Sequence, residues 1–221
     1  LFSQCFLPVK KMGFESLLKK SPKLFGLYLI KIRYFSPILI LVLSFVIYPV
    51  NAHHPWEGPV TEFSVVQGFL SGLAHPILGV DHFLFLLSIG LLSVGSPIKY
   101  SFRFLLIGLL GALFSQVSPS LSSLELLMGL SLFLSAYIAN KKINPNFMLP
   151  LIFVHGYFLG QVMVGAEPSS IFAYLIGLCA IEFILILIGI FTFKKLSKYK
   201  EYLYGILIGS GFVITQNILF R

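Results

Sequence analysis

The sequence has little charge, and acidic residues are the scarcest part of it. Only 11% of its 221 residues are Asp, Glu, Lys or Arg, while 57% are hydrophobic. Soluble domains carry about 25% charged residues. Asp81 is the only aspartate in the chain. This composition excludes an ordinary soluble domain and is typical of a protein whose solvent is lipid.

Other absences narrow the chemistry. The chain has two cysteines, Cys5 and Cys179, and no Cys-x2-Cys pair, so we expect neither a disulfide framework nor a cysteine metal site. It has no Gly-x4-Gly-Lys-Ser/Thr phosphate loop and no His-Glu-x2-His zinc motif, so no motif predicts ATP hydrolysis or a zinc protease. No exposed segment interleaves basic and aromatic residues, which argues against binding of nucleic acid.

The positive charge of the chain, a net +8, belongs mainly to its beginning. Residues 1–52 carry seven of the sixteen basic residues, an apolar stretch of eleven residues at Ile38–Tyr48, and a small-residue cleavage site at Ala52. This pattern predicts a cleavable secretory signal peptide. A retained anchor is the alternative, but the apolar stretch is short for a span of about 20 residues. We therefore expect a leader, 1–52, and a transmembrane permease domain, 53–221.

The rest of the chain reads as a set of membrane-spanning helices. Apolar character is continuous within each segment and does not alternate with period two, which predicts helices and not barrel strands. We expect an all-α, polytopic bundle of about six spans, at residues 64–94, 101–117, 121–139, 147–165, 170–193 and 202–220. Basic residues collect in alternate linkers, and the positive-inside rule then places the mature N-terminus outside.

One apolar segment, Gly68–Gly90, contains His75, Asp81 and His82. Ionisable residues within lipid are expensive and mark functional sites by default. On a straight helix the two histidines would share a face but lie about 10 Å apart along the axis, too far to bind one ion at about 2.0–2.2 Å. We predict that this first span is broken at Pro76–Gly79 and that the break gathers both imidazoles and the carboxylate around a divalent transition metal.

These residues also have a purely structural interpretation. His75 can bond a carbonyl left free at the break, and Asp81 can cap the helix that follows. Taken singly, either residue fits that interpretation. Three ionisable residues within eight positions of a lipid-embedded segment favour a function instead.

Four further residues are candidate metal ligands. His53 and His54 would begin the mature chain, where they either capture an ion outside or belong to a solvated tail. His155 in the fourth span is either an interhelical hydrogen-bonding residue or a further ligand. Glu182 in the fifth span either pairs, stays protonated, or relays a cation or proton.

Three Gly-x3-Gly motifs permit close helix packing: Gly68/Gly72, Gly156/Gly160 and Gly205/Gly209. The first pair lies beside His75 and the second beside His155. We therefore expect these two motifs to bring the first and fourth spans together around a common cavity.

The leader, the N-terminal histidines, the motif His-Pro-x2-Gly-x-Asp-His in the first span and the His-Gly pair in the fourth span resemble the HupE/UreJ family. The family pattern in the fourth span resembles His-Gly-x2-His-Gly-x-Glu. Here Leu159 replaces its second His, Val162 replaces its Glu, and Glu182 stands where a later His is expected. The resemblance implies a small bacterial inner-membrane permease for nickel or cobalt, found with hydrogenase or urease genes.

We accordingly expect no enzyme and no permanently bound cofactor, but uptake of Ni²⁺ or Co²⁺, with Zn²⁺ as a further candidate, and a link to a nickel or cobalt enzyme maturation system. Two other functions stay open: an intramembrane metal-dependent hydrolase, in which the same residues hold zinc and its water, and a non-transporting metalloenzyme assembly factor. Since only neutral imidazole binds metal, uptake should fall as the pH drops through the histidine range.

Overall fold

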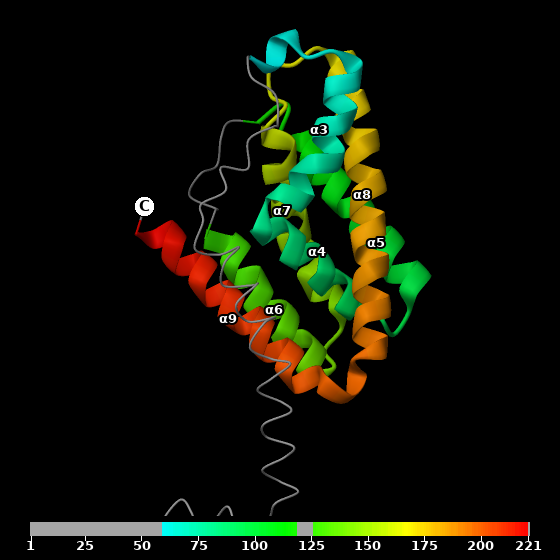
Figure 1. Cartoon of the computed structure of the whole chain (residues 1–221), viewed down its shortest axis with the longest axis vertical. Coiled ribbons are helices and arrows are strands. Elements are labelled where there is room, and N and C mark those ends of the chain that lie inside the picture. The colour runs from blue at the N-terminus through cyan, green and yellow to red at the C-terminus, as the bar shows by residue number, and fades with distance from the viewer. Residues whose placement is uncertain (1–58, 119–125, 221) are drawn as a thin grey trace, which may run out of the picture. The chain divides into compact units, whose positions relative to one another are not determined.

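The computed structural model describes residues 59–118 and 126–220, and every regular element within these ranges is a helix (Figure 1). The predicted all-α class is confirmed for this part of the chain. The α-helices are α3 (Val65–Leu78), α4 (Val80–Ser93), α5 (Pro97–Phe114), α6 (Leu126–Lys141), α7 (Leu149–Gln161), α8 (Pro168–Lys195) and α9 (Lys200–Leu219). Three short 3₁₀ turns accompany them: η1 (Val60–Glu62), η3 (Pro145–Met148) and η4 (Ser197–Tyr199).

The helices occupy the six segments in which the sequence predicts membrane spans. Three stretches are long and apolar enough to cross a membrane: α5, α8 and Ser197–Leu219, which contains α9. Helices α3 and α4 together make a fourth candidate, and α6 is apolar but shorter. The predicted signal peptide, 1–52, and the first five residues of the third predicted span lie outside the described residues. The protein is thus a membrane protein with three or four candidate spans in its described part.

The surface of α8 has the character expected of a helix in lipid. Large apolar side chains face outward along it, including Phe172 and Phe191, which are 67% and 68% exposed. Inside the bundle several serines are buried, and their hydroxyls donate to carbonyls of their own helices, as Ser131 does to Met128 and Ser135 to Leu132. A bilayer requires this arrangement, in which buried polar groups are hydrogen-bonded within the protein and apolar side chains face the lipid.

Helices α3 and α4 are separated by a sharp break at Gly79. Pro76 lies within α3 and has no backbone N–H, which removes one hydrogen bond from the last turns of that helix. Gly79 then adopts an extended conformation with φ −80° and ψ 104°, and α4 leaves at 80° to α3. A bend of this kind belongs either to a broken span or to a re-entrant loop. The predicted break at Pro76–Gly79 is confirmed, and its non-helical residue is Gly79.

The helices pack mainly in three pairs: α3 with α8, α5 with α7, and α6 with α9. Figure 1 shows α6 and α9 side by side and α8 as the long orange helix. Helix α4 is the exception, because it packs against α8, α6 and α5 together. Its first turns therefore lie in the interior of the bundle, and this places the residues after the break in the protein core.

The helix partners predicted from the Gly-x3-Gly motifs are wrong. Gly68 and Gly72 pack against the backbone of α8, and Gly156 and Gly160 pack against the backbone of α5. The glycines do permit the close packing expected of them. A glycine motif predicts only that some helix backbone can approach closely, however, and does not identify which helix it is. The first and fourth predicted spans meet through side chains of α4 and α7 instead.

Candidate metal centre

Three imidazoles lie in a row inside the bundle. His75 comes from the last turn of α3, His82 from the first turn of α4 and His155 from α7, and they are 3%, 5% and 2% exposed. The ring centroids of His75 and His82 are 5.4 Å apart, and those of His82 and His155 are also 5.4 Å apart. The break at Gly79 brings the first two together, since a straight helix would hold them about 10 Å apart.

Ring nitrogens of His82 and His155 lack hydrogen bonds in the part of the chain that the structure describes. Nδ1 of His82 and both ring nitrogens of His155 have no hydrogen-bond partner among the described residues. The carbonyl of Leu151, one turn before His155, is near enough to act on its ring, but the contact lacks the geometry of a hydrogen bond. A buried polar atom without a partner costs about 1–3 kcal/mol. These nitrogens are therefore free to bind a ligand.

Sequence reasoning missed the residue that packs against His155. The ring of Phe85, on α4, stacks on the imidazole with 3.4 Å between ring centroids and 12° between ring planes. Phe85 is 2% exposed and belongs to the hydrophobic core. Its position three residues after His82 was the available signal, because residues three apart share a helix face.

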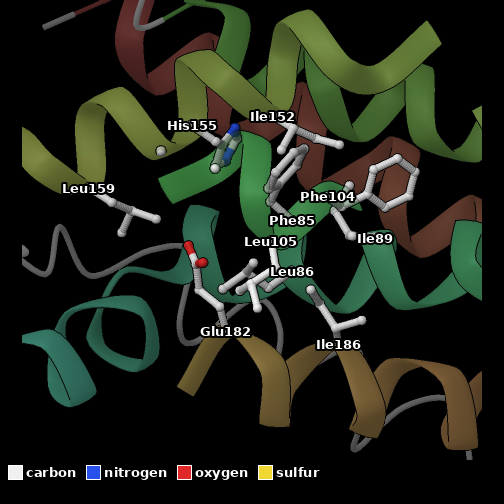
Figure 2. A pocket seen from close by; sticks show the side chains of 12 residues that line it. Phe85, Leu86, Ile89, Phe104, Leu105, Ile152, His155, Leu159, Glu182 and Ile186 are labelled. Carbon is white, nitrogen blue, oxygen red and sulfur yellow. The ribbon is translucent and has the colours of Figure 1, made fainter. Parts of the chain in front are cut away.

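His155 and Glu182 line one small cavity (Figure 2). Its volume is about 10 Å³, which is close to the space that one water molecule needs. Glu182 on α8 lines the cavity, and apart from His155 the other lining residues, which include Leu86 and Ile152, are apolar or glycine. Glu182 is only 3% exposed, and no other described residue gives it a hydrogen bond or an ion pair. The cavity is therefore lined by two ionisable side chains, His155 and Glu182, that have no hydrogen-bond partner among the described residues.

Asp81 lies at the break, beside the histidine row. Its side chain is half-buried, and one of its carboxylate oxygens lies 3.2 Å from the point where a Cβ on Gly79 would stand. The Cδ2 atom of His82 is 2.8 Å from the same point. The absence of a side chain at position 79 thus leaves room for both the aspartate and the imidazole that follow it.

A family model described as HupE / UreJ protein matches residues 40–218, a range that includes the helix break, the histidine row and Glu182. The chain belongs to the HupE/UreJ family. HupE/UreJ proteins are membrane transporters, not enzymes, and are associated with nickel and cobalt uptake for hydrogenase and urease. The family predicted from the motifs is therefore confirmed. No curated protein and no solved structure matches the chain.

The three imidazoles of this HupE/UreJ protein form a row and not a closed cage. Within residues 59–118 and 126–220, no three His, Cys, Asp or Glu side chains converge closely enough to hold one metal ion. Among the candidates predicted from the sequence, His75, His82 and His155 come together, and Glu182 shares a cavity with His155. His53 and His54 lie outside the described residues. The arrangement offers a cation a succession of neighbouring ligand pairs.

Proposed function

We propose that this protein carries a divalent transition-metal cation, nickel or cobalt, across the bacterial inner membrane along the row formed by His75, His82 and His155. The row is the observation that carries the proposal. Imidazole nitrogen suits nickel, cobalt and zinc better than magnesium or calcium. The three buried imidazoles come from three helices, and two of them have ring nitrogens without a partner in the described part of the chain. Burying such groups without a partner is destabilising, which favours a function for them.

The spacing of the rings supports this use. Two imidazoles bound to one tetrahedral cation at about 2.0–2.1 Å have ring centroids roughly 5 Å apart. Both neighbouring pairs in the row are spaced at 5.4 Å. Conduction requires sites that bind firmly enough to admit an ion and weakly enough to release it. Successive two-nitrogen positions meet that requirement better than a closed four-ligand cage, which is typical of structural zinc.

The remaining candidates take places along the same path. In the proposed route His53 and His54 capture the ion outside, and Asp81 attracts it to the break. Glu182 receives it beyond His155, across the cavity that the two residues share. The carboxylate would supply the negative charge that the fourth span lacks, since Val162 stands where the family pattern has a glutamate. No resident cofactor takes part.

The proposed topology has six crossings after a cleaved leader, with α3 and α4 forming one broken span and the mature N-terminus outside. This assignment puts the basic linkers on the cytoplasmic side, as the positive-inside rule requires. A broken span of this kind is a recurrent way to build an ion site in a transporter, because it frees backbone and side-chain ligands at membrane depth.

The test is uptake of radioactive nickel into cells, with cobalt, zinc and manganese as competitors, comparing wild type with His82→Ala. His82 is the middle ring of the row, so its loss should abolish accumulation of nickel or cobalt. The matched control is Ser93→Ala, which alters a fully buried polar residue of the same helix that lies away from the row. Normal uptake by His82→Ala, at equal protein level, would reject the proposal.

Two alternatives predict different results for Asp81→Asn. A transporter loses metal accumulation, whereas an intramembrane hydrolase loses turnover of a lipid-phase substrate with no change in accumulation. A non-transporting assembly factor is separated by supplying excess external nickel to cells that lack the protein. Nickel rescues the missing enzyme activity if the protein transports the metal, and fails to rescue it if the protein assembles the enzyme.

A further inference from the structure

We infer that Phe85 is a positioning residue: by stacking on the imidazole of His155 it fixes the plane of that ring and so sets the metal affinity at the α7 end of the histidine row. The inference rests on the proposed transport function, and it gives a role to a residue that no motif singles out. It concerns how strongly the ion is held and not whether the protein has a path for it.

The geometry of the contact is that of an ordered stack. The ring planes of Phe85 and His155 are 12° from parallel, with centroids 3.4 Å apart, and both side chains are 2% exposed. His82 meets the same imidazole edge-on, at 85° between planes. Figure 2 shows Phe85 and His155 on the wall of one cavity, coming from α4 and α7. One face of the imidazole is therefore covered by the aromatic ring of Phe85.

The stack orients the ring of His155, which in most metal-binding histidines is done by a hydrogen bond. A histidine that binds metal generally donates its other ring N–H to a carboxylate or carbonyl, which fixes the orientation of the ring. Neither nitrogen of His155 has such a partner among the described residues. Besides the nearby carbonyl of Leu151, which lies outside hydrogen-bond geometry, the aromatic contacts of Phe85 and His82 orient the ring, and only that of Phe85 is face to face.

The same contact favours the metal-bound form. A cation bound to imidazole withdraws electron density from the ring, so its face becomes more positive. The face of phenylalanine is electron-rich, and it attracts a positively polarised group lying over it. In an apolar, water-poor interior this attraction is stronger than at a surface. Phe85 thus orients the imidazole and also stabilises it once the ion has bound.

The first experiment measures cobalt affinity with the purified full-length protein in nanodiscs, using the visible spectrum of bound Co²⁺. Phe85→Leu removes the ring and should weaken Co²⁺ binding about three- to tenfold, the range for loss of one aromatic stacking contact. Phe85→Tyr keeps the ring and should stay within about twofold of wild type on the same scale. Phe63→Leu is the matched control, because Phe63 is also buried, at 5% exposed, but lies in the other hydrophobic cluster.

The second experiment examines the stack without any metal. In protein labelled with ¹³C-histidine, the ring protons of His155 should carry an upfield shift from the face of Phe85, with the signal assigned by its loss in His155→Gln. Phe85→Leu should remove that shift, and Phe63→Leu should leave it unchanged. If Phe85→Leu alters neither this signal nor the Co²⁺ affinity, the positioning role is wrong. If His82→Ala and His155→Gln leave the affinity unchanged, the proposed function fails and the inference falls with it.

Discussion

Gly79 is the residue at which one predicted span becomes two helices, and its missing side chain shapes the site. Its backbone angles, φ −80° and ψ 104°, are open to any residue, so backbone strain does not require glycine here. The space available favours it. His82 and Asp81 occupy the region that a Cβ at position 79 would enter. At this scale the same residue breaks the helix and makes room for the groups that follow it.

We therefore expect Gly79→Ala to fold normally but to transport poorly. The new Cβ would stand 2.8 Å from Cδ2 of His82 and 3.2 Å from an oxygen of Asp81, so both side chains must shift. Shifts around a metal ligand cost roughly tenfold in affinity or more. The measurement is concentration-dependent nickel uptake together with the thermal stability of the purified protein. Gly95→Ala, in a turn with no neighbour within 4 Å, is the control, and equal uptake by the two variants would contradict this account.

Glu182 carries a second prediction at the residue scale. Its buried carboxylate has no ion-pair or hydrogen-bond partner among the described residues, so its neutral isostere breaks no existing contact. We expect Glu182→Gln to keep or raise the unfolding temperature, because an unpaired buried acid is destabilising. Metal uptake should fall on the order of tenfold or more. The control is Glu201→Gln, which changes an exposed glutamate near Lys200.

The outcome for Glu182→Gln separates two roles of the carboxylate. A lower unfolding temperature with unchanged uptake would mean that the acid stabilises the bundle and does not serve the metal path. Unchanged stability with reduced uptake would favour the proposed role beyond His155.

At the scale of the helices, glycine contacts determine which elements lie together. Gly72 of α3 packs directly on the backbone of α8, and a Cβ there would meet the carbonyl oxygen of Tyr174 and come within 2.8 Å of the amide nitrogen of Leu178. Backbone atoms cannot move aside as a flexible side chain can. The pairing of α3 with α8 therefore depends on the absence of a side chain at Gly72.

Gly72→Ala should therefore destabilise the protein by about 1–3 kcal/mol, the usual cost of overpacking a tight contact. Gly205→Ala is the matched control on α9, because no atom lies within 4 Å of the new Cβ. Alanine there should be neutral or stabilising by up to about 1 kcal/mol, since it favours helix over glycine. Thermal unfolding in detergent, followed by size-exclusion chromatography, should rank the two variants in this order. Equal stabilities would mean that the α3–α8 contact can relax.

At the scale of the whole molecule, the distribution of charge predicts which loops face the cytoplasm. Lys142 lies in a basic linker after α6, while Glu167 lies in a linker without basic residues before α8. Both side chains are exposed. With the native cysteines replaced by serine, Glu167→Cys should react with a membrane-impermeant maleimide in intact cells. Lys142→Cys should react only after the cells are permeabilised.

The labelling pattern tests the proposed topology independently of transport. Labelling of both positions from outside would contradict the assignment of α7 as a crossing. The reverse pattern would invert the whole protein and place the mature N-terminus in the cytoplasm. Either result would leave the geometry of the histidine row intact, because that geometry depends on packing and not on orientation.

The sequence by itself determined the helices and the place where the first of them breaks. Continuous apolar runs bounded by Pro, Gly and polar residues specify helices locally, and α5, α8 and α9 begin and end within a few residues of their predicted limits. Pro76 and Gly79 interrupt the backbone hydrogen bonding of their own segment. The histidines were also identifiable from sequence, because an ionisable residue within an apolar run is unusual and can be recognised without knowing its neighbours in space.

Only the tertiary structure decided which of these residues meet. In a bundle that is apolar on every side, hydrophobicity does not select one helix neighbour over another, and close packing does so instead. It paired α3 with α8 and α5 with α7, so the first and fourth spans meet through α4 and α7 and not at their Gly-x3-Gly motifs. It also set His82 between His75 and His155, and stacked Phe85 on His155. His155 is remote in sequence from both His82 and Phe85, so no local pattern encodes these two contacts.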